Sequence, residues 1–199
     1  MAGRRMRAPE RRRQLLEVAA AEFARRGYHG TTTAQLAKAA KITEPILYRH
    51  FTNKQALFVT LVDEVGDEVI AAWRASLEQA TTPAERLGVL LAGNPATHER
   101  GRGIYRVIFH AMSESRNDEE IMAALQRHIG RLTAFLTDEI SHLQQQKVVR
   151  KDASASGIAL HLVQVAIGFG MLEPLGIKGV SSAKDRTDVQ RLLATLLKA

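Results

Sequence analysis

The chain has 199 residues, of which 45% are apolar and none is cysteine, so it can bury a sizeable core but has no disulfide framework and no thiolate site. Its formal net charge is +7, and the excess lies in residues 1–54, which carry 12 lysines and arginines against 4 acids; residues 55–199 carry 16 basic and 17 acidic residues. This asymmetry predicts an anionic partner for the N-terminal segment, either nucleic acid or a membrane surface, against the simpler alternative of a solvated basic tail.

The basic N-terminus is not followed by an apolar run, so it does not form a secretory signal. The most apolar stretch, residues 157–172, is short for a membrane span and contains His161 and Gln164. The sequence therefore predicts a soluble, cytoplasmic protein that has no membrane partner.

Helical periodicity recurs from end to end and almost no segment alternates like a strand, which predicts an all-α fold. The first helix has an apolar stripe and is stopped by Gly27, a plausible residue for its C-terminal cap. The stripe consists of Leu15, Leu16, Ala19 and Phe23.

A second, short helix begins within a run of three threonines. Taking Thr32 as N-cap puts Gln35 three residues later, which is a capping-box pattern, although Thr31 and Thr33 are competing caps.

The segment "KITEPILYRHF", residues 41–51, predicts a third short helix. Thr43 is a suitable N-cap, and it is followed by Glu44, favoured by the helix dipole, and by Pro45, whose missing N–H costs nothing there. The helix ends by Phe51, and Asn53 caps a longer helix. Short helices joined by a tight turn are the pattern of a helix-turn-helix.

The chain beyond residue 54 predicts a helical bundle. Its predicted helices run from 54 to beyond Trp73, from about Pro83, and over 104–114, 118–146, 152–172 and 185–197, with the chief loop at 92–103. The last helix is expected to bury Val189, Leu192, Leu193 and Leu196.

Residues 15–58 carry the pattern "F..RGY.GTT...LA..A.I....LYRHF.NK..L", which resembles the tetracycline-repressor (TetR) family of bacterial regulators. The resemblance covers about a quarter of the chain. It implies an N-terminal helix-turn-helix DNA-binding domain over 1–53, with the motif at about 32–51, and a larger helical ligand-binding and dimerisation domain over 54–199. Lys41 stands where the family commonly has a glycine, and a left-handed backbone there would cost on the order of 1 kcal/mol.

The resemblance makes residues 43–51 the recognition helix, whose N-terminal residues enter the major groove. By position, the candidates for base contacts are Thr43, Glu44, Pro45 and Ile46. Glu44 could accept from a cytosine amino group, Ile46 could pack on a thymine methyl, and Gln35 could read an adenine.

The same resemblance implies phosphate contacts from Tyr48, His50 and Lys54, which set register without reading sequence. Thr32 or Thr33 adds a hydroxyl at a helix N-terminus pointed at the DNA backbone. Three arginines of the N-terminal arm would follow the backbone or enter a neighbouring minor groove: Arg4, Arg5 and Arg7.

Several of these residues have a structural alternative. Thr32 and Thr43 can be helix caps only, and Pro45 can serve to shape the helix start. Arg49 can pair with an acid inside the protein instead of meeting DNA.

The family pairs its last two long helices with their copies in a four-helix bundle, which here implies a homodimer through about 153–172 and 185–197. Ordinary intrachain packing is the alternative. The family also binds an inducer in the larger domain. Residues that could line such a pocket, or be plain core, are Trp73, Tyr105, Phe109, Met112, Phe135, His161 and Met171.

No catalytic, cofactor or metal site is predicted, since the seven histidines show no paired metal spacing and there is no P-loop or nucleophile elbow. The sequence therefore predicts a DNA-binding transcription regulator, most simply a repressor released from a palindromic operator by a small molecule. The alternative is a helical protein whose basic N-terminus docks on membrane surfaces or binds the nucleoid non-specifically.

Overall fold

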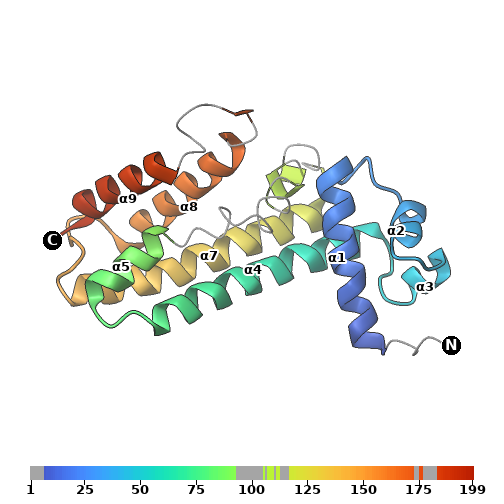
Figure 1. Ribbon diagram of the computed structural model, residues 1–199, viewed down its shortest axis with the longest axis horizontal. Helices are drawn as coiled ribbons and strands as arrows, with labels where there is room; N and C mark the ends of the chain where they lie inside the picture. The colour runs from blue at the N-terminus through green and yellow to red at the C-terminus, as the bar shows by residue number, and fades with distance from the viewer. Residues whose placement is uncertain are drawn as a thin grey trace. The chain divides into compact units, whose positions relative to one another are not determined.

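The computed structural model describes residues 7–92, 105, 107–109, 111–112, 117–172, 175–176 and 183–199, and within these ranges the chain is helical without a strand (Figure 1). The predicted all-α fold is confirmed. The helices are α1 (Ala8–Arg26), α2 (Thr33–Ala39), α3 (Glu44–Tyr48), α4 (Lys54–Glu78), α5 (Pro83–Ala92), α7 (Glu119–Gln145), α8 (Ala155–Leu172) and α9 (Ala183–Leu197).

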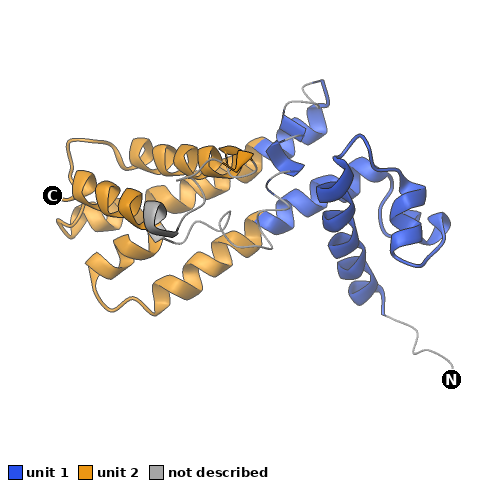
Figure 2. Cartoon of the chain, turned by 45° about the horizontal axis from the view of Figure 1, so that its top comes forward, with its two compact units in different colours: residues 1–65, 103–125 blue, residues 66–102, 126–199 orange. Residues whose placement is uncertain are grey.

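The chain forms two compact units (Figure 2). Unit 1 comprises residues 1–65 and 103–125, and unit 2 comprises residues 66–102 and 126–199. Unit 1 thus contains all of the predicted DNA-binding segment together with the first turns of α4 and of α7.

The helix boundaries in unit 1 follow the signals in the sequence. Gly27 ends α1 with φ 74°, and its N–H donates to the Phe23 carbonyl at 2.8 Å. The Asn53 side-chain oxygen accepts from the Ala56 N–H at 2.7 Å and so caps α4. These capping predictions are confirmed.

Three aromatic rings form the centre of unit 1. The ring of Phe23 lies 5.8 Å from that of Tyr28 and 5.6 Å from that of Phe58, and Tyr28 and Phe58 are 4.9 Å apart. Burial, with a contribution from the Asp118 charge, raises the pKa of Tyr28 to about 12. The helices α1, α2 and α3 pack around this cluster through buried side chains, which are Leu15, Leu16, Leu36 and Leu47.

Unit 2 has its core between α4, α5 and α7. Buried residues recur on α4 at helical spacing, at Val69, Trp73 and Leu77. An ion pair of 2.7 Å joins Arg86 of α5 to Glu139 of α7, and Arg86 also donates to the Leu77 carbonyl. Buried residues also recur at helical spacing on α7, at Leu132, Leu136, Ile140 and Leu143.

Helices α8 and α9 differ from the sequence prediction in two respects. The first is that α8 begins at Ala155 rather than Asp152, because the Ser154 hydroxyl caps it by accepting from the Gly157 N–H at 3.1 Å. The second is that Leu192 and Leu196 are 58% and 54% exposed in the single chain, and Val189 and Leu193 are only partly buried, so the predicted burial of these four residues is wrong. The prediction failed here because helical periodicity shows that one face of a helix is apolar but does not show which other surface covers that face.

Helix α8 is long and apolar enough to cross a membrane by length and composition alone, so the expectation that this stretch is short for a span is wrong, and only 17% of the helix is buried within the chain. The predicted loop at 92–103 lies outside the described residues beyond Ala92. Within the predicted helix 104–114, the described residues 105, 107–109 and 111–112 are helical.

Candidate nucleic-acid interface

Helix α3 has only five residues, too few to be stable by itself, and tertiary packing holds it in place. Leu47 and, just after the helix, Phe51 are buried in unit 1. Thr43, Pro45 and Tyr48 are exposed. The short helix therefore has one anchored face and one face open to solvent.

The turn between α2 and α3 contains Lys41, for which the sequence left the backbone conformation open. Lys41 has φ 55°, the left-handed region. The Ile42 N–H donates to the Ala37 carbonyl at 2.9 Å and the Lys41 N–H to the Lys38 carbonyl at 3.1 Å, which together form a Schellman motif. The turn is thus an ordinary helix C-terminus in which lysine takes the place of glycine.

The three threonines before α2 have three different roles. Thr31 is fully buried, and its hydroxyl donates to the Gly27 carbonyl at 2.8 Å. The Thr32 hydroxyl accepts from the Gln35 N–H at 3.2 Å as N-cap, so the predicted capping box is confirmed. Thr33 is the first residue of α2, and its hydroxyl takes no part in capping that helix.

The capping box also limits Gln35. Its side-chain oxygen accepts from the Thr32 N–H at 3.0 Å, which occupies one of the two lone pairs of that oxygen and fixes the orientation of the amide. Bidentate reading of adenine uses both the oxygen and the nitrogen of the amide. Gln35 can therefore contact an adenine with both amide atoms only in the orientation that the capping bond allows, or after that bond breaks.

The N-cap of α3 is Thr43, as predicted, but its hydroxyl makes no capping bond. Thr43 is exposed, so its hydroxyl remains available to an external partner. The next residue, Glu44, instead accepts a hydrogen bond of 2.7 Å from the Thr33 hydroxyl of α2.

Lys54 directs its amine into unit 1. The Nζ atom donates to the carbonyl oxygens of Tyr28 and Thr31, both at 2.9 Å, and lies 4.4 Å from the centre of the Tyr28 ring. Burial lowers the pKa of this amine. The side chain thus ties the α1–α2 loop to the start of α4, and its phosphate contact stays a prediction.

Arg12 is a structural residue that sequence reasoning missed. Its guanidinium donates to the His50 carbonyl at 3.1 Å, donates to the Thr60 hydroxyl at 3.4 Å, and lies 4.4 Å from the centre of the Phe51 ring. The contacts span 38 and 48 residues of sequence, so no local signal could have revealed them. Arg12 fixes the end of α3 against α1 and α4.

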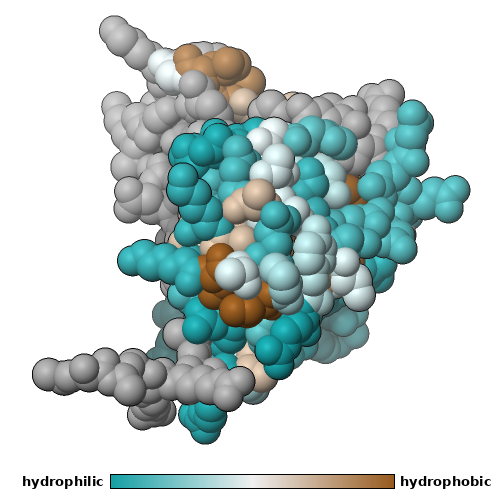
Figure 3. Space-filling view, turned by 90° about the vertical axis from the view of Figure 1, so that its right-hand side faces the viewer, coloured by the Kyte–Doolittle hydropathy of each residue, from teal (hydrophilic) through white to brown (hydrophobic). Residues whose placement is uncertain are grey.

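The surface around α2 and α3 is hydrophilic apart from a small apolar patch (Figure 3). Arg49 is exposed there and makes no ion pair within the described part of the chain, whereas Arg7 pairs with Glu10 at 2.8 Å. Burial lowers the pKa of His50, and the charges of Arg49, Arg11 and Arg12 lower it further. Arg4 and Arg5 lie outside the described residues.

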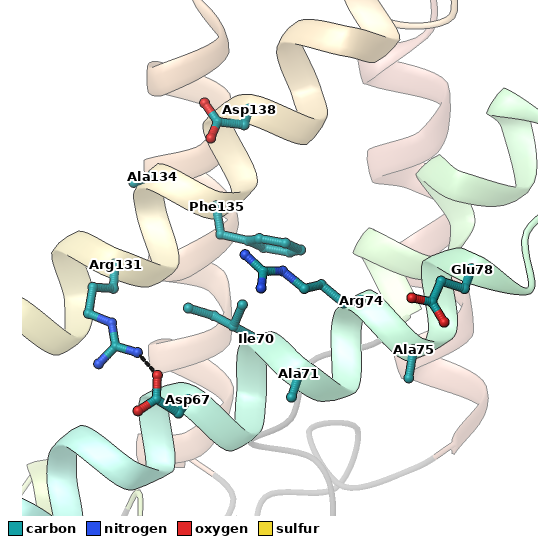
Figure 4. A pocket seen from close by; sticks show the side chains of 10 residues that line it. All are labelled: Asp67, Ile70, Ala71, Arg74, Ala75, Glu78, Arg131, Ala134, Phe135 and Asp138. Atoms are coloured by element: carbon teal, nitrogen blue, oxygen red, sulfur yellow. Dashed lines mark hydrogen bonds and ion pairs between the residues drawn. The ribbon is translucent and has the colours of Figure 1, made fainter.

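Unit 2 has a surface cleft of about 570 Å³ between α4 and α7 (Figure 4). Its charged lining residues are Asp67, Arg74, Glu78, Arg131 and Asp138, and Asp67 and Arg131 form an ion pair. Of the residues predicted to contact a ligand, Phe135 lines this cleft, with the Arg74 guanidinium over its ring.

The other predicted ligand residues are not gathered at that cleft. Trp73 stacks on Phe135 with ring centres 5.6 Å apart but is buried, and Tyr105 is buried in unit 1, where burial raises its pKa. Phe109 and Met112 are partly buried, whereas His161 and Met171 are exposed on α8. In the described part of the chain nothing accepts a hydrogen bond from the buried Trp73 indole N–H.

Comparison with known proteins identifies the family that has this arrangement of short helices. The model of the bacterial regulatory proteins of the tetR family matches residues 15–61, which include α2, α3 and the capping residues described above. The chain belongs to the TetR family. It is a DNA-binding transcription regulator of the helix-turn-helix type and, like its relatives, not an enzyme.

Among its relatives, the chain is 27% identical over 165 residues to the transcriptional activator FasR of Mycolicibacterium smegmatis, covering 83% of this chain and 73% of FasR. It is 39% identical over 83 residues to the repressor KstR2 of Mycobacterium tuberculosis, which covers 41% of this chain and 42% of KstR2. The crystal structure of AibR with isovaleryl coenzyme A and operator DNA has the same fold, with a TM-score of 0.70, 22% identity, and 95% and 98% of the two chains covered.

Proposed function

We propose that this TetR-family chain is a repressor that binds a palindromic operator as a homodimer and is released by a small-molecule effector. In this proposal residues 1–53 bind DNA and residues 54–199 bind the effector and form the dimer, in the cytoplasm. The observation that carries it is the exposed N-terminal face of α3, whose side chains project from a helix anchored in the core.

The proposed base contacts are those of Thr43, Glu44, Pro45 and Ile46, since Thr43 and Pro45 are exposed and the Thr43 hydroxyl is uncommitted. Tyr48 and His50 are proposed to hold phosphates. The proposed role of Thr32 is narrower, because its hydroxyl already caps α2 and can contact a phosphate only through its remaining lone pair and proton.

The proposed dimer face is the apolar surface of α8 and α9. Its exposed members are Leu160, Met171, Leu172, Leu192 and Leu196. An apolar face of this kind on a soluble protein indicates an interaction surface. A two-fold dimer presents two recognition helices, which is why the operator is expected to be palindromic.

The proposed effector site lies in unit 2 around Trp73. A buried donor without an acceptor costs about 1–3 kcal/mol, and a ligand oxygen would remove that cost. Trp73→Phe keeps an aromatic ring beside Phe135 but replaces the larger indole and removes its N–H, so we expect it to weaken effector binding while leaving operator binding intact. Thermal-shift screening of effector candidates against both proteins measures this, and an identical response in both would exclude the indole N–H as a ligand donor.

Selection of operator sequences from a randomised double-stranded DNA pool, at moderate salt, tests the DNA-binding proposal. An enriched palindrome supports sequence-specific binding by a dimer. Retention without any enriched motif would favour the alternative, a basic surface that binds nucleoid or anionic membrane. A promoter–reporter assay with the selected operator then distinguishes repression from activation, since both kinds of regulator occur among the relatives.

A further inference from the structure

Three side chains of α2 and α3 form a directed chain of hydrogen bonds. The Tyr48 hydroxyl donates to the Thr33 hydroxyl oxygen at 3.3 Å, and the Thr33 hydroxyl donates to a carboxylate oxygen of Glu44, Oε2, at 2.7 Å. An ionised carboxylate only accepts and each hydroxyl has one proton, so the direction is fixed. The bond to Glu44 is charge-assisted and is the stronger of the two.

The backbone brings these three groups together. Glu44 and Tyr48 are four residues apart on α3 and therefore share one face of it. Thr33 begins α2, and the turn at Lys41 sets the two helices so that Thr33 meets both. Glu44 is half-buried in this contact and so has a defined orientation.

Glu44 carries a negative charge in a segment that is otherwise without acidic residues. It is the sole acid between Glu22 and Asp63 in the sequence, and it lies on the surface that would face DNA phosphates. A carboxylate there weakens binding to any DNA by repelling the backbone. The presence of a carboxylate held in a fixed geometry at this place is explained if Glu44 discriminates between DNA sequences.

We propose that Glu44 reads a cytosine in each half-site and that Thr33 is the positioning residue for its carboxylate; the proposal rests on the sequence-specific DNA binding proposed above. Oxygen Oε2 is held by Thr33, whereas Oε1 has no hydrogen-bond partner in the described part of the chain. In the major groove cytosine presents an amino donor, but guanine and thymine present acceptors that a carboxylate repels. Adenine places its N7 acceptor beside its amino group and is disfavoured for that reason.

A competing role for Glu44 makes a different prediction. If the carboxylate only withdraws the Thr33 and Tyr48 hydroxyls from phosphates, removing its charge strengthens binding to every sequence and changes no base preference. The two roles are thus separated by base preference at one position, not by overall affinity.

The experiment is a binding-site selection with four full-length proteins: wild type, Glu44→Gln, Thr33→Val and the control Thr33→Ser. Wild type should prefer cytosine at one position of each half-site by on the order of fivefold or more. Glu44→Gln should lose that preference and keep the others. Thr33→Val, which has nearly the same shape but no hydroxyl, should relax the same position, and Thr33→Ser should retain it.

Base preference is read from the bound fraction, so a variant that folds less completely still gives a valid answer. An unchanged motif in Glu44→Gln would overturn the proposal while leaving sequence-specific binding intact. A relaxed position in Glu44→Gln but not in Thr33→Val would overturn the positioning role of Thr33. If wild type enriched no motif at all, the proposed function and this inference would fall together.

Discussion

Lys54 and Arg12 direct their positive charges into unit 1, although both lie in the segment whose basic excess predicts an anionic partner. Each side chain donates to backbone carbonyls that lie just outside the ends of short helices, where the helix itself leaves carbonyls without a partner. A count of basic residues in this segment therefore overstates the charge available to DNA.

Lys54→Ala should lower the free energy of unfolding by about 1–2 kcal/mol, because it removes two charge-assisted hydrogen bonds that are partly exposed. Urea denaturation compares it with wild type. Lys38→Ala is the matched control: Lys38 is exposed and its side chain has no hydrogen bond or ion pair within the described part of the chain, so this loss of charge should change stability by less than about 0.5 kcal/mol. Wild-type stability together with weakened DNA binding would instead assign Lys54 to phosphate contact alone.

His50 should make the stability of the protein depend on pH. Its pKa is lowered in the folded state, first by burial and then by Arg49, Arg11 and Arg12. The unfolded chain therefore binds the proton more tightly, so stability falls as pH drops below about 6.5 and levels off below the folded pKa. His50→Gln should flatten the stability profile between about pH 5 and 7.5.

An NMR titration of the His50 ring, in wild type and in Arg49→Ala, checks the cause of this shift. Removing the Arg49 charge should raise the His50 pKa toward its ordinary value, with burial maintaining part of the shift. A His50 that titrates identically in both proteins would show that Arg49 does not act on it.

At the scale of elements, α2 and α7 end in the same motif with the same unfavourable residue. Lys41 and Lys147 have φ 55° and 59°, and in both motifs the next residue donates to the carbonyl five positions earlier, at 2.9 and 3.0 Å. Glycine adopts this backbone at no steric cost. Both helix ends should therefore become more stable when lysine is replaced by glycine.

We expect Lys41→Gly and Lys147→Gly, made separately, to raise the free energy of unfolding by about 1 kcal/mol each. Lys38→Gly removes the same charge from helical backbone of α2 and should instead lower it by up to about 1 kcal/mol. Chemical denaturation of the three variants gives these values. The same sign for Lys41→Gly and Lys38→Gly would mean that the backbone at Lys41 is not left-handed in solution.

The capping residues of these elements could be predicted because each acts within a few residues of itself. Thr32 with Gln35, Gly27 and Asn53 are examples, and the family pattern located α3. The contacts of Lys54 and Glu44 were not predictable in this way, since Lys54 meets carbonyls 23 and 26 residues away and Glu44 meets a hydroxyl 11 residues away. These residues, which are far apart in the sequence, come into contact only when α1, α2 and α3 pack together.

At the scale of the whole molecule, the largest unexplained feature of the single chain is the apolar surface of α8 and α9. Leu192 and Leu196 lie one turn apart on α9 and are more than half exposed. Sequence periodicity predicted that these residues would be covered, and the family resemblance predicted a second copy as the cover. A dimer reconciles both expectations with the exposure that is observed.

Leu192→Glu should therefore convert the protein to a monomer, because a carboxylate replaces an apolar side chain at the proposed interface. We expect the dimer dissociation constant to rise at least about 30-fold, the effect of roughly 2 kcal/mol. Sedimentation equilibrium over a range of protein concentrations measures this. The control is Ala72→Glu, which adds the same charge at an exposed position of α4.

Operator binding connects this prediction to function. The Leu192→Glu monomer should bind one half-site only weakly, and its affinity should no longer depend on the spacing between half-sites, since two recognition helices are no longer held together. Circular dichroism establishes that the variant keeps its helices. A wild-type protein that is monomeric at all concentrations, or a Leu192→Glu protein that remains dimeric, would mean that another surface joins the subunits and that α8 and α9 are covered by something else.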